Sequence, residues 1–225
     1  MEIKVLDQFP QLVLNKESVF KIMDCHEEST VYGEVAREYE RLEPWLYEKV
    51  HPKAVIAWEP QSSSLLERLR LPEGKAEPGI YLEPKSRGFL YLVMTLGKEP
   101  ENYSSKLFED GEYLSGMLLG AMADEYLFLF EDQVMPEVKA FCAVPGFGVL
   151  RRMEAPMDIP LEFHQYVYER CDLKALLGME LSSGYMFDPV KTSCLVFLLS
   201  DETSIFNAWH DCSHCPAVGC RRRKV

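Results

Sequence analysis

Three cysteines near the end of the printed sequence are the residues whose type and spacing most directly predict chemistry. Cys212, Cys215 and Cys220 form a Cys-x2-Cys-x4-Cys pattern. Thiolates spaced in this way can hold one soft metal atom from a single turn of chain. We therefore predict that these three cysteines bind a metal. The spacing fits both zinc and an iron–sulfur cluster, and it does not choose between them.

The same pattern does not mark a fourth ligand. His214, His210, Cys25 or a residue of a partner protein could supply it, or the position could stay open. The basic residues 221–224 that follow would lower the pKa values of the thiols and offset the negative charge of a cluster. Two alternatives stay open: a disordered tail with unligated or oxidised thiols, and a redox-active dithiol.

Two further segments have the composition of ligand-binding loops. The first is Val144-Pro145-Gly146-Phe147-Gly148, where glycine permits positive φ angles and lets a ligand approach the backbone amides. The second is Leu181–Pro189, in which Tyr185 could stack on a ligand or donate a hydrogen bond to it. The residues alone favour structural roles, a tight turn after a strand and an ordinary loop with a half-buried tyrosine.

Composition and charge exclude several classes of protein. The chain has 225 residues, 47% of them apolar and 27% charged, which is typical of a globular protein large enough for one domain or two small ones. A net charge of −12 argues against nucleic-acid binding. The first residues lack an apolar export segment, so we expect a cytoplasmic protein with reduced thiols and no membrane association. P-loop, dinucleotide-binding and serine-hydrolase motifs are absent.

The elements that must position these residues are predicted from hydrophobic periodicity. The run Gly111–Gln133 is apolar on nearly all sides and too short between charges to span a membrane, which predicts a buried core helix that ends at Pro136. Further helices are expected at Asn15–Met23, Ser29–Val50, Ser63–Arg70, Asn102–Glu109 and Pro160–Cys171, and a turn at Ala175–Met179. Strands are expected at Lys53–Trp58, Ile80–Glu83, Gly88–Leu96, Val138–Val144 and Thr192–Leu199.

Helices and strands are mixed without strict alternation, which favours an α+β fold with a largely antiparallel sheet. We expect one domain over residues 1–205, with a helical part at about 15–50, followed by a Cys-rich basic tail over residues 206–225.

Several short motifs follow one another in a set order along the chain. They are Thr95-Leu96-Gly97, Gly111-Glu112-Tyr113-Leu114 with Ala121-x-Ala123-Asp124, Pro145-Gly146-Phe147-Gly148, and Leu177-Gly178-Met179-x-Leu181 with Tyr185 and Pro189. This ordered set resembles a known family, the activation (reactivation) domain of cobalamin-dependent methionine synthase in its free-standing bacterial form. The resemblance covers most of the chain from about Phe20 onward. Free-standing relatives also tend to end in a Cys-x2-Cys-x4-Cys tail followed by arginines.

The resemblance implies a C-shaped α+β domain around a twisted antiparallel sheet. It also implies binding of S-adenosylmethionine and docking on a cobalamin-binding methyltransferase or other corrinoid protein. There the inactive cob(II)alamin is reduced, with flavodoxin or ferredoxin as an electron donor, and is then methylated. The cofactor-binding residues that the resemblance implies are Cys142, Ala143, Val144, Pro145, Gly146, Phe147 and Tyr185.

Several positions depart from the family pattern. Cys142 stands where the family has an arginine that helps to hold the ligand carboxylate, and Phe147 stands where it has a tyrosine. Ser182-Ser183 replaces Thr-Glu, and Thr192-Ser193-Cys194 replaces Ser-x-Ser. On this basis we expect weak or absent binding of S-adenosylmethionine.

Two functions follow from the residues together with the resemblance. The first is a reactivation factor for a corrinoid methyltransferase, in which an iron–sulfur tail could relay the electron. The second is a non-catalytic docking or assembly module for such a complex, with a structural zinc or no metal in the tail. A zinc hydrolase is disfavoured, because three thiolates with a closing ligand form a structural site. No catalytic residue is assigned.

Overall fold

The computed structural model describes residues 1–62, 65, 86–213, 215 and 218–220. The helix expected at Ser63–Arg70, Leu65 apart, and the strand expected at Ile80–Glu83 lie outside the described residues. The same holds for His214 and for the basic residues 221–224.

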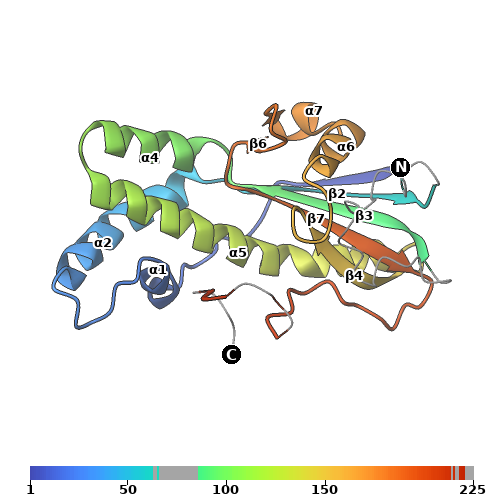
Figure 1. Ribbon diagram of the computed structural model, residues 1–225, viewed down its shortest axis with the longest axis horizontal. Coiled ribbons are helices and arrows are strands. Elements are labelled where there is room, and N and C mark those ends of the chain that lie inside the picture. The colour runs from blue at the N-terminus through green and yellow to red at the C-terminus, as the bar shows by residue number, and fades with distance from the viewer. Residues whose placement is uncertain (63–64, 66–85, 214, 216–217, 221–225) are drawn as a thin grey trace.

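The described chain is built around one antiparallel sheet flanked by helices, which confirms the predicted α+β class (Figure 1). The strand order is β1-β2-β3-β7-β4, and every neighbouring pair is antiparallel. The edge strand β1 was not predicted. The five strands are β1 (Glu2–Leu6), β2 (Lys53–Pro60), β3 (Ser86–Thr95), β4 (Gly148–Glu154) and β7 (Thr192–Ser200), and a separate short hairpin joins β5 (Glu180–Leu181) to β6 (Phe187–Asp188).

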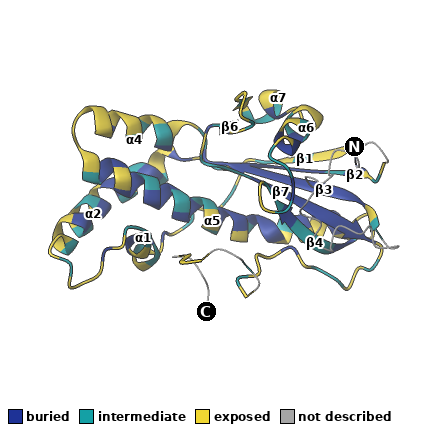
Figure 2. Ribbon diagram, viewed as in Figure 1, coloured by how far each residue is buried: buried dark blue, intermediate teal, exposed yellow. Residues whose placement is uncertain are grey.

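The central strands are covered on both faces. In β3, Leu90, Leu92 and Met94 face the long helix α5 (Tyr113–Ala143), whereas Phe89 and Tyr91 face the opposite side. Helices α6 (Phe163–Arg170) and α7 (Leu173–Leu177) cover that second side. Figure 2 shows β3 and β7 buried along their length. This arrangement explains why both strands are continuously apolar in sequence instead of alternating.

The run at Gly111–Gln133 is a core helix, as predicted, but α5 does not end at Pro136. It continues to Ala143, so the predictions of a stop at Pro136 and of a strand at Val138–Val144 are wrong. Val134, Val138 and Phe141 recur at helical spacing and bury one face of α5. Pro136 lies on the exposed side, where water can reach the carbonyl group left without its helical partner.

Three helices pack on the first half of α5 and form a second apolar cluster beyond the sheet (Figure 1). They are α1 (Lys16–Ile22), α2 (Tyr32–Lys49) and α4 (Glu99–Glu109). Asn15 caps α1, because its side-chain oxygen accepts a hydrogen bond from the Ser18 amide at 3.1 Å. Helix α2 runs through Pro44 without a break. Within the described chain, no helix combines the length and the apolar character needed to cross a membrane.

A buried carboxylate ties the sheet to α6. The side chain of Glu59 on β2 is 6% exposed and accepts hydrogen bonds from the hydroxyl groups of Tyr91 and Tyr166, both at 2.6 Å, and from Arg170 Nε at 2.8 Å. Burial raises the pKa of Glu59, but the bonds from Tyr166, Tyr91 and Arg170 outweigh it and hold the pKa below its ordinary value. Since its charge is fully satisfied, this group stabilises the fold.

The segment after β7 returns to the sheet. The Val149 amide donates to Ile205 O and the Asn207 amide donates to Val149 O, both at 2.9 Å, and Ala208 is fully buried. Packing therefore continues through Ala208, past residue 205, where the sequence predicted the end of the domain.

Two truncations should separate the packed part of this segment from the rest. Removing residues 206–225 should lower stability by about 2 kcal/mol, because one backbone hydrogen bond and the contacts of Phe206 and Ala208 are lost. The melting temperature should then fall by roughly 4–8 °C. Removing only residues 212–225 should change stability by less than about 0.5 kcal/mol. Thermal unfolding followed by circular dichroism checks both, and equal melting temperatures would contradict the packing role.

Stability should depend on the ionisation of Glu59. Its folded pKa lies below the unfolded value of about 4.3. The stabilisation is therefore fully present above that value and is lost as pH falls through the folded pKa. Glu59→Gln should destabilise the protein by about 2 kcal/mol near neutral pH, and the difference from the unsubstituted protein should shrink below about pH 4. Urea unfolding at both pH values checks this, with the exposed Glu109→Gln as control. A difference that does not change with pH would contradict it.

Candidate functional site

The predicted turn Val144–Gly148 follows the long helix α5 and not a strand. Cys142 lies in the last turn of α5, is 2% exposed, and has its pKa raised to about 11 by burial. Its carbonyl oxygen accepts a hydrogen bond from the Phe147 amide at 2.9 Å, and the Phe147 ring packs against Trp58 with centroids 5.1 Å apart. Gly148 is required here, because a Cβ atom would lie 2.1 Å from Glu202 O. Ala143, Val144, Pro145 and Gly146 are exposed.

Tyr185 lies on the other face of the sheet from this turn. It is at the tip of the β5–β6 hairpin with φ of 62°, and its carbonyl oxygen lies 2.9 Å from Nδ1 of His164 on α6. It borders an open cavity of about 360 Å³ together with Tyr168, Ser182 and Ser183. The structure thus keeps Cys142 and Phe147 together but does not bring Tyr185 to them.

The tail cysteines lie near the surface. Cys212 and Cys215 are half-exposed, and Cys220 is exposed. Among the described residues, no group of three or more histidine, cysteine or acidic side chains is placed to hold a metal ion. Cys25, named as a possible fourth ligand, is buried in the helical cluster around α1 and α2. Metal binding by the tail stays a prediction.

A cavity of about 270 Å³ between α5 and the sheet was not predicted from the sequence, and it gathers charged groups. Helix α5 supplies one wall from positions that share a helix face, and the end of β4 and the start of β7 supply the other. The lining residues are Asp124, Leu127, Phe128, Glu131, Arg152, Glu154, Val190, Lys191, Thr192 and Ser193.

A β-bulge points Arg152 toward this cavity. In the pairing of β4 with β7, Val149 lies opposite Leu199 and Arg151 opposite Leu198, so one extra residue is inserted between them. Because side chains alternate between faces, this insertion reverses the facing of every residue that follows. Arg152 therefore lies opposite Phe197 on the α5 side of the sheet.

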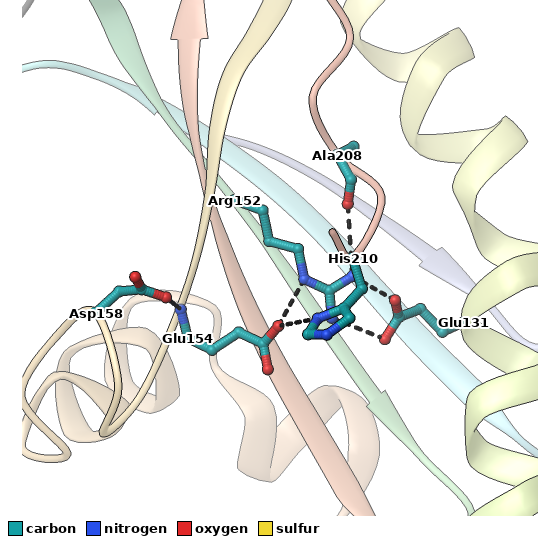
Figure 3. A network of polar contacts seen from close by, with 6 residues as sticks. All are labelled: Glu131, Arg152, Glu154, Asp158, Ala208 and His210. Carbon is teal, nitrogen blue, oxygen red and sulfur yellow. Dashed lines mark hydrogen bonds and ion pairs between the residues drawn. The ribbon is translucent and has the colours of Figure 1, made fainter. Parts of the chain in front are cut away.

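Arg152 is held between two carboxylates (Figure 3). Its side chain and that of Glu131 are each 10% exposed, and the guanidinium donates to both oxygens of Glu131 through Nη1 and Nη2. Its Nε donates to Glu154 at 2.7 Å, and its Nη1 lies 3.5 Å from Ala208 O. Burial lowers the pKa of Arg152, but Glu131 and then Glu154 outweigh it and raise the pKa. The guanidinium is charged at all ordinary pH values.

The rest of the cavity combines a second ion pair with apolar walls. Lys191 Nζ lies 2.6 Å from Asp124 and donates to Gly120 O at 3.2 Å. Phe128 and Val190 are 45% and 56% exposed, so the apolar side of the cavity reaches the surface. The arrangement can bind a molecule that carries charged groups of both signs and an apolar part.

The packed segment that follows β7 also reaches this cavity. Ala208 O contacts Arg152, and Nδ1 of His210 lies 3.7 Å from Glu154 (Figure 3). Cys212 follows two residues after His210, which is a span of at most about 7 Å. The beginning of the Cys-rich tail is thereby anchored beside the charged cavity.

Sequence reasoning missed Arg152, Glu131 and Glu154. A signal was present, because two consecutive arginines interrupt an apolar run in Val149-Leu-Arg-Arg-Met153. Buried arginine requires a carboxylate partner. A glutamate inside the apolar core helix, such as Glu131, was the matching candidate.

Comparison with known proteins identifies the fold. No protein-family model and no curated protein sequence matches the chain. Among solved structures, the crystal structure of the MetH reactivation domain bound to AdoHcy matches with a TM-score of 0.59 at 10% sequence identity. The match covers 90% of this chain and 79% of that one. The chain therefore has the fold of the MetH reactivation domain, as its resemblance to that domain predicted.

Proposed function

We propose that this protein binds S-adenosylmethionine in the cavity at Arg152 and acts as a reactivation factor for a corrinoid methyltransferase. The observation that carries the proposal is the buried Arg152–Glu131 pair in a cavity with apolar walls, within the fold of a domain whose solved structure holds AdoHcy. AdoHcy shares the adenosyl and amino-acid groups of S-adenosylmethionine.

The family pattern has its arginine at the position of Cys142, whereas this chain places a guanidinium, that of Arg152, beside the cavity and paired with Glu131 and Glu154. The expectation of weak binding rested on Ser183 and on Cys142, which cannot make a bidentate pair with a carboxylate. Arg152 lies in a cavity, Cys142 in the apolar core. Lys191 and Asp124 add a cation and an anion for the two ends of an amino-acid group.

The size of the cavity and its exposed mouth support transfer of a methyl group from the bound ligand to a second protein. A volume of about 270 Å³ is just below the usual range of about 300–1,000 Å³ for ligand sites, so a ligand as long as S-adenosylmethionine must extend beyond it. A donor that passes its methyl group to a bound corrinoid has to stay accessible. Exposed apolar side chains continue from Phe128 along α5 through Met117 to Tyr113, where a partner protein could dock.

In the proposed reaction, the partner's cob(II)alamin takes one electron to become cob(I)alamin. The reduced cobalt then forms a bond to the methyl group of S-adenosylmethionine. The bond between that methyl group and the sulfur breaks, and S-adenosylhomocysteine is released. Flavodoxin or ferredoxin is the proposed electron donor, and an iron–sulfur cluster at Cys212, Cys215 and Cys220 would relay the electron beside the cavity. The role of the described residues is to bind and orient the methyl donor.

Replacing the buried ion pair with apolar residues should abolish tight ligand binding. The double variant Arg152→Met/Glu131→Met removes both charges together, so it should fold. Its affinity for S-adenosylmethionine should fall about 10- to 100-fold, the value of one charge-assisted hydrogen bond. Isothermal titration calorimetry measures this. Arg87→Met, an exposed arginine outside the cavity, is the control. If the unsubstituted protein gives no binding heat, the alternative of a docking module without a methyl donor is supported instead.

The tail can be tested separately. Anaerobically purified protein should contain iron and absorb visible light if the cluster is present, and Cys212→Ser/Cys215→Ser should remove both signals. Ser213→Ala, which lies between these cysteines, should retain them. Metal analysis that finds zinc and no iron excludes the electron relay and leaves a structural site. Metal-free protein contradicts both forms of the prediction.

A further inference from the structure

The residues that line the cavity include more negative than positive side chains. Among the described lining residues there are three carboxylates, Asp124, Glu131 and Glu154, and two cations, Arg152 and Lys191. Lys191 is matched by Asp124. Arg152 is shared between Glu131 and Glu154, so among the described lining residues one carboxylate has no lysine or arginine of its own. The imidazole of His210 lies 3.7 Å from Glu154.

The excess charge is available to a ligand at Glu154. The side chain of Glu131 is 10% exposed and is engaged through both oxygens by Arg152. The side chain of Glu154 is 36% exposed and gives Arg152 only Oε1, at 2.7 Å. The Glu154 backbone is fixed in place, because its amide donates to Asp158 Oδ2 at 2.9 Å. The carboxylate is thus anchored at the cavity wall through Oε1, and none of the described residues donates a hydrogen bond to its second oxygen.

The two candidate ligands differ by the charge that this site would detect. S-adenosylmethionine carries a sulfonium, an ammonium and a carboxylate, and therefore one net positive charge. S-adenosylhomocysteine has a neutral thioether in place of the sulfonium and no net charge. An unbalanced carboxylate in a partly buried site interacts with a cation far more strongly than one in water does.

We infer that Glu154 makes the cavity selective for the sulfonium form of the ligand over its neutral thioether product. The inference rests on the proposed function, because it concerns the same cavity. Its consequence is release of the spent donor: once the methyl group has been transferred, the ligand loses the charge that held it against Glu154. Occupancy by product is thereby reduced without any change in the shape of the site.

Calorimetry with three ligands tests this charge discrimination. The titrations are run at about pH 8, above the ordinary pKa of a free imidazole. S-adenosylmethionine should bind about tenfold more tightly than S-adenosylhomocysteine. Sinefungin, which carries an ammonium group in place of the methylsulfonium, should bind like S-adenosylmethionine, since the site detects charge and not the methyl group.

Glu154→Gln should reduce the affinity ratio of the two adenosyl ligands toward one, mainly by weakening S-adenosylmethionine. Glutamine keeps an oxygen that can accept from Arg152 Nε. The control is Glu109→Gln on α4, which removes one exposed negative charge that does not line the cavity and should leave the ratio unchanged. This control separates a local effect from the net charge of −12 on the whole chain.

The outcomes distinguish the inference from the proposed function. Equal binding of the two adenosyl ligands by the unsubstituted protein, or a ratio that Glu154→Gln does not change, overturns the selectivity and leaves the ligand site standing. Absence of binding for all three ligands overturns both.

Discussion

The ion pair between Arg152 and Glu131 is the interaction on which the arrangement around the cavity depends. A guanidinium that is only 10% exposed cannot be left without a carboxylate, because an unpaired buried charge costs several kcal/mol. Glu131 meets this need from α5, and Arg152 comes from the edge strand β4, so the pair fixes the distance between helix and sheet edge. At this position charged side chains replace the apolar contacts between α5 and the sheet, and they line a polar cavity. The fold and the candidate site are therefore joined by one contact.

Much of the scaffold could be predicted because it follows from hydrophobic periodicity. The strands β2, β3 and β7 and the first part of α5 are continuous apolar runs, and their sequence leaves few other structures open. The strand β4 could not be found in this way, because Arg151 and Arg152 interrupt its apolar residues. Its bulge then places Arg152 on the side opposite to simple alternation. The segment assigned to a strand, Val138–Val144, belongs instead to α5, since Pro136 lies on an exposed side where the helix tolerates it.

The candidate site was missed for the same physical reason. The residues that the sequence singled out are a turn, a loop and a thiol motif, each recognisable from a few consecutive letters. The cavity instead combines residues of α5, β4 and β7 that are spread over positions 124–193 and come together only in the folded chain. The structure also relates two features that the sequence presents separately. Ala208 and His210 contact Arg152 and Glu154, and Cys212 follows directly, so the Cys-rich tail starts at the cavity wall.

Folding and function make different demands on these charges. One carboxylate is enough to compensate Arg152 inside the protein, and Glu131 provides it through two hydrogen bonds. Glu154 is a second carboxylate on the same guanidinium, and a second negative charge in a partly buried site costs stability unless another positive charge approaches it. Buried charges that have no counter-charge within the protein are typical of binding sites, where the ligand supplies the opposite charge. Under the proposed function, the sulfonium of the methyl donor would bring the missing positive charge.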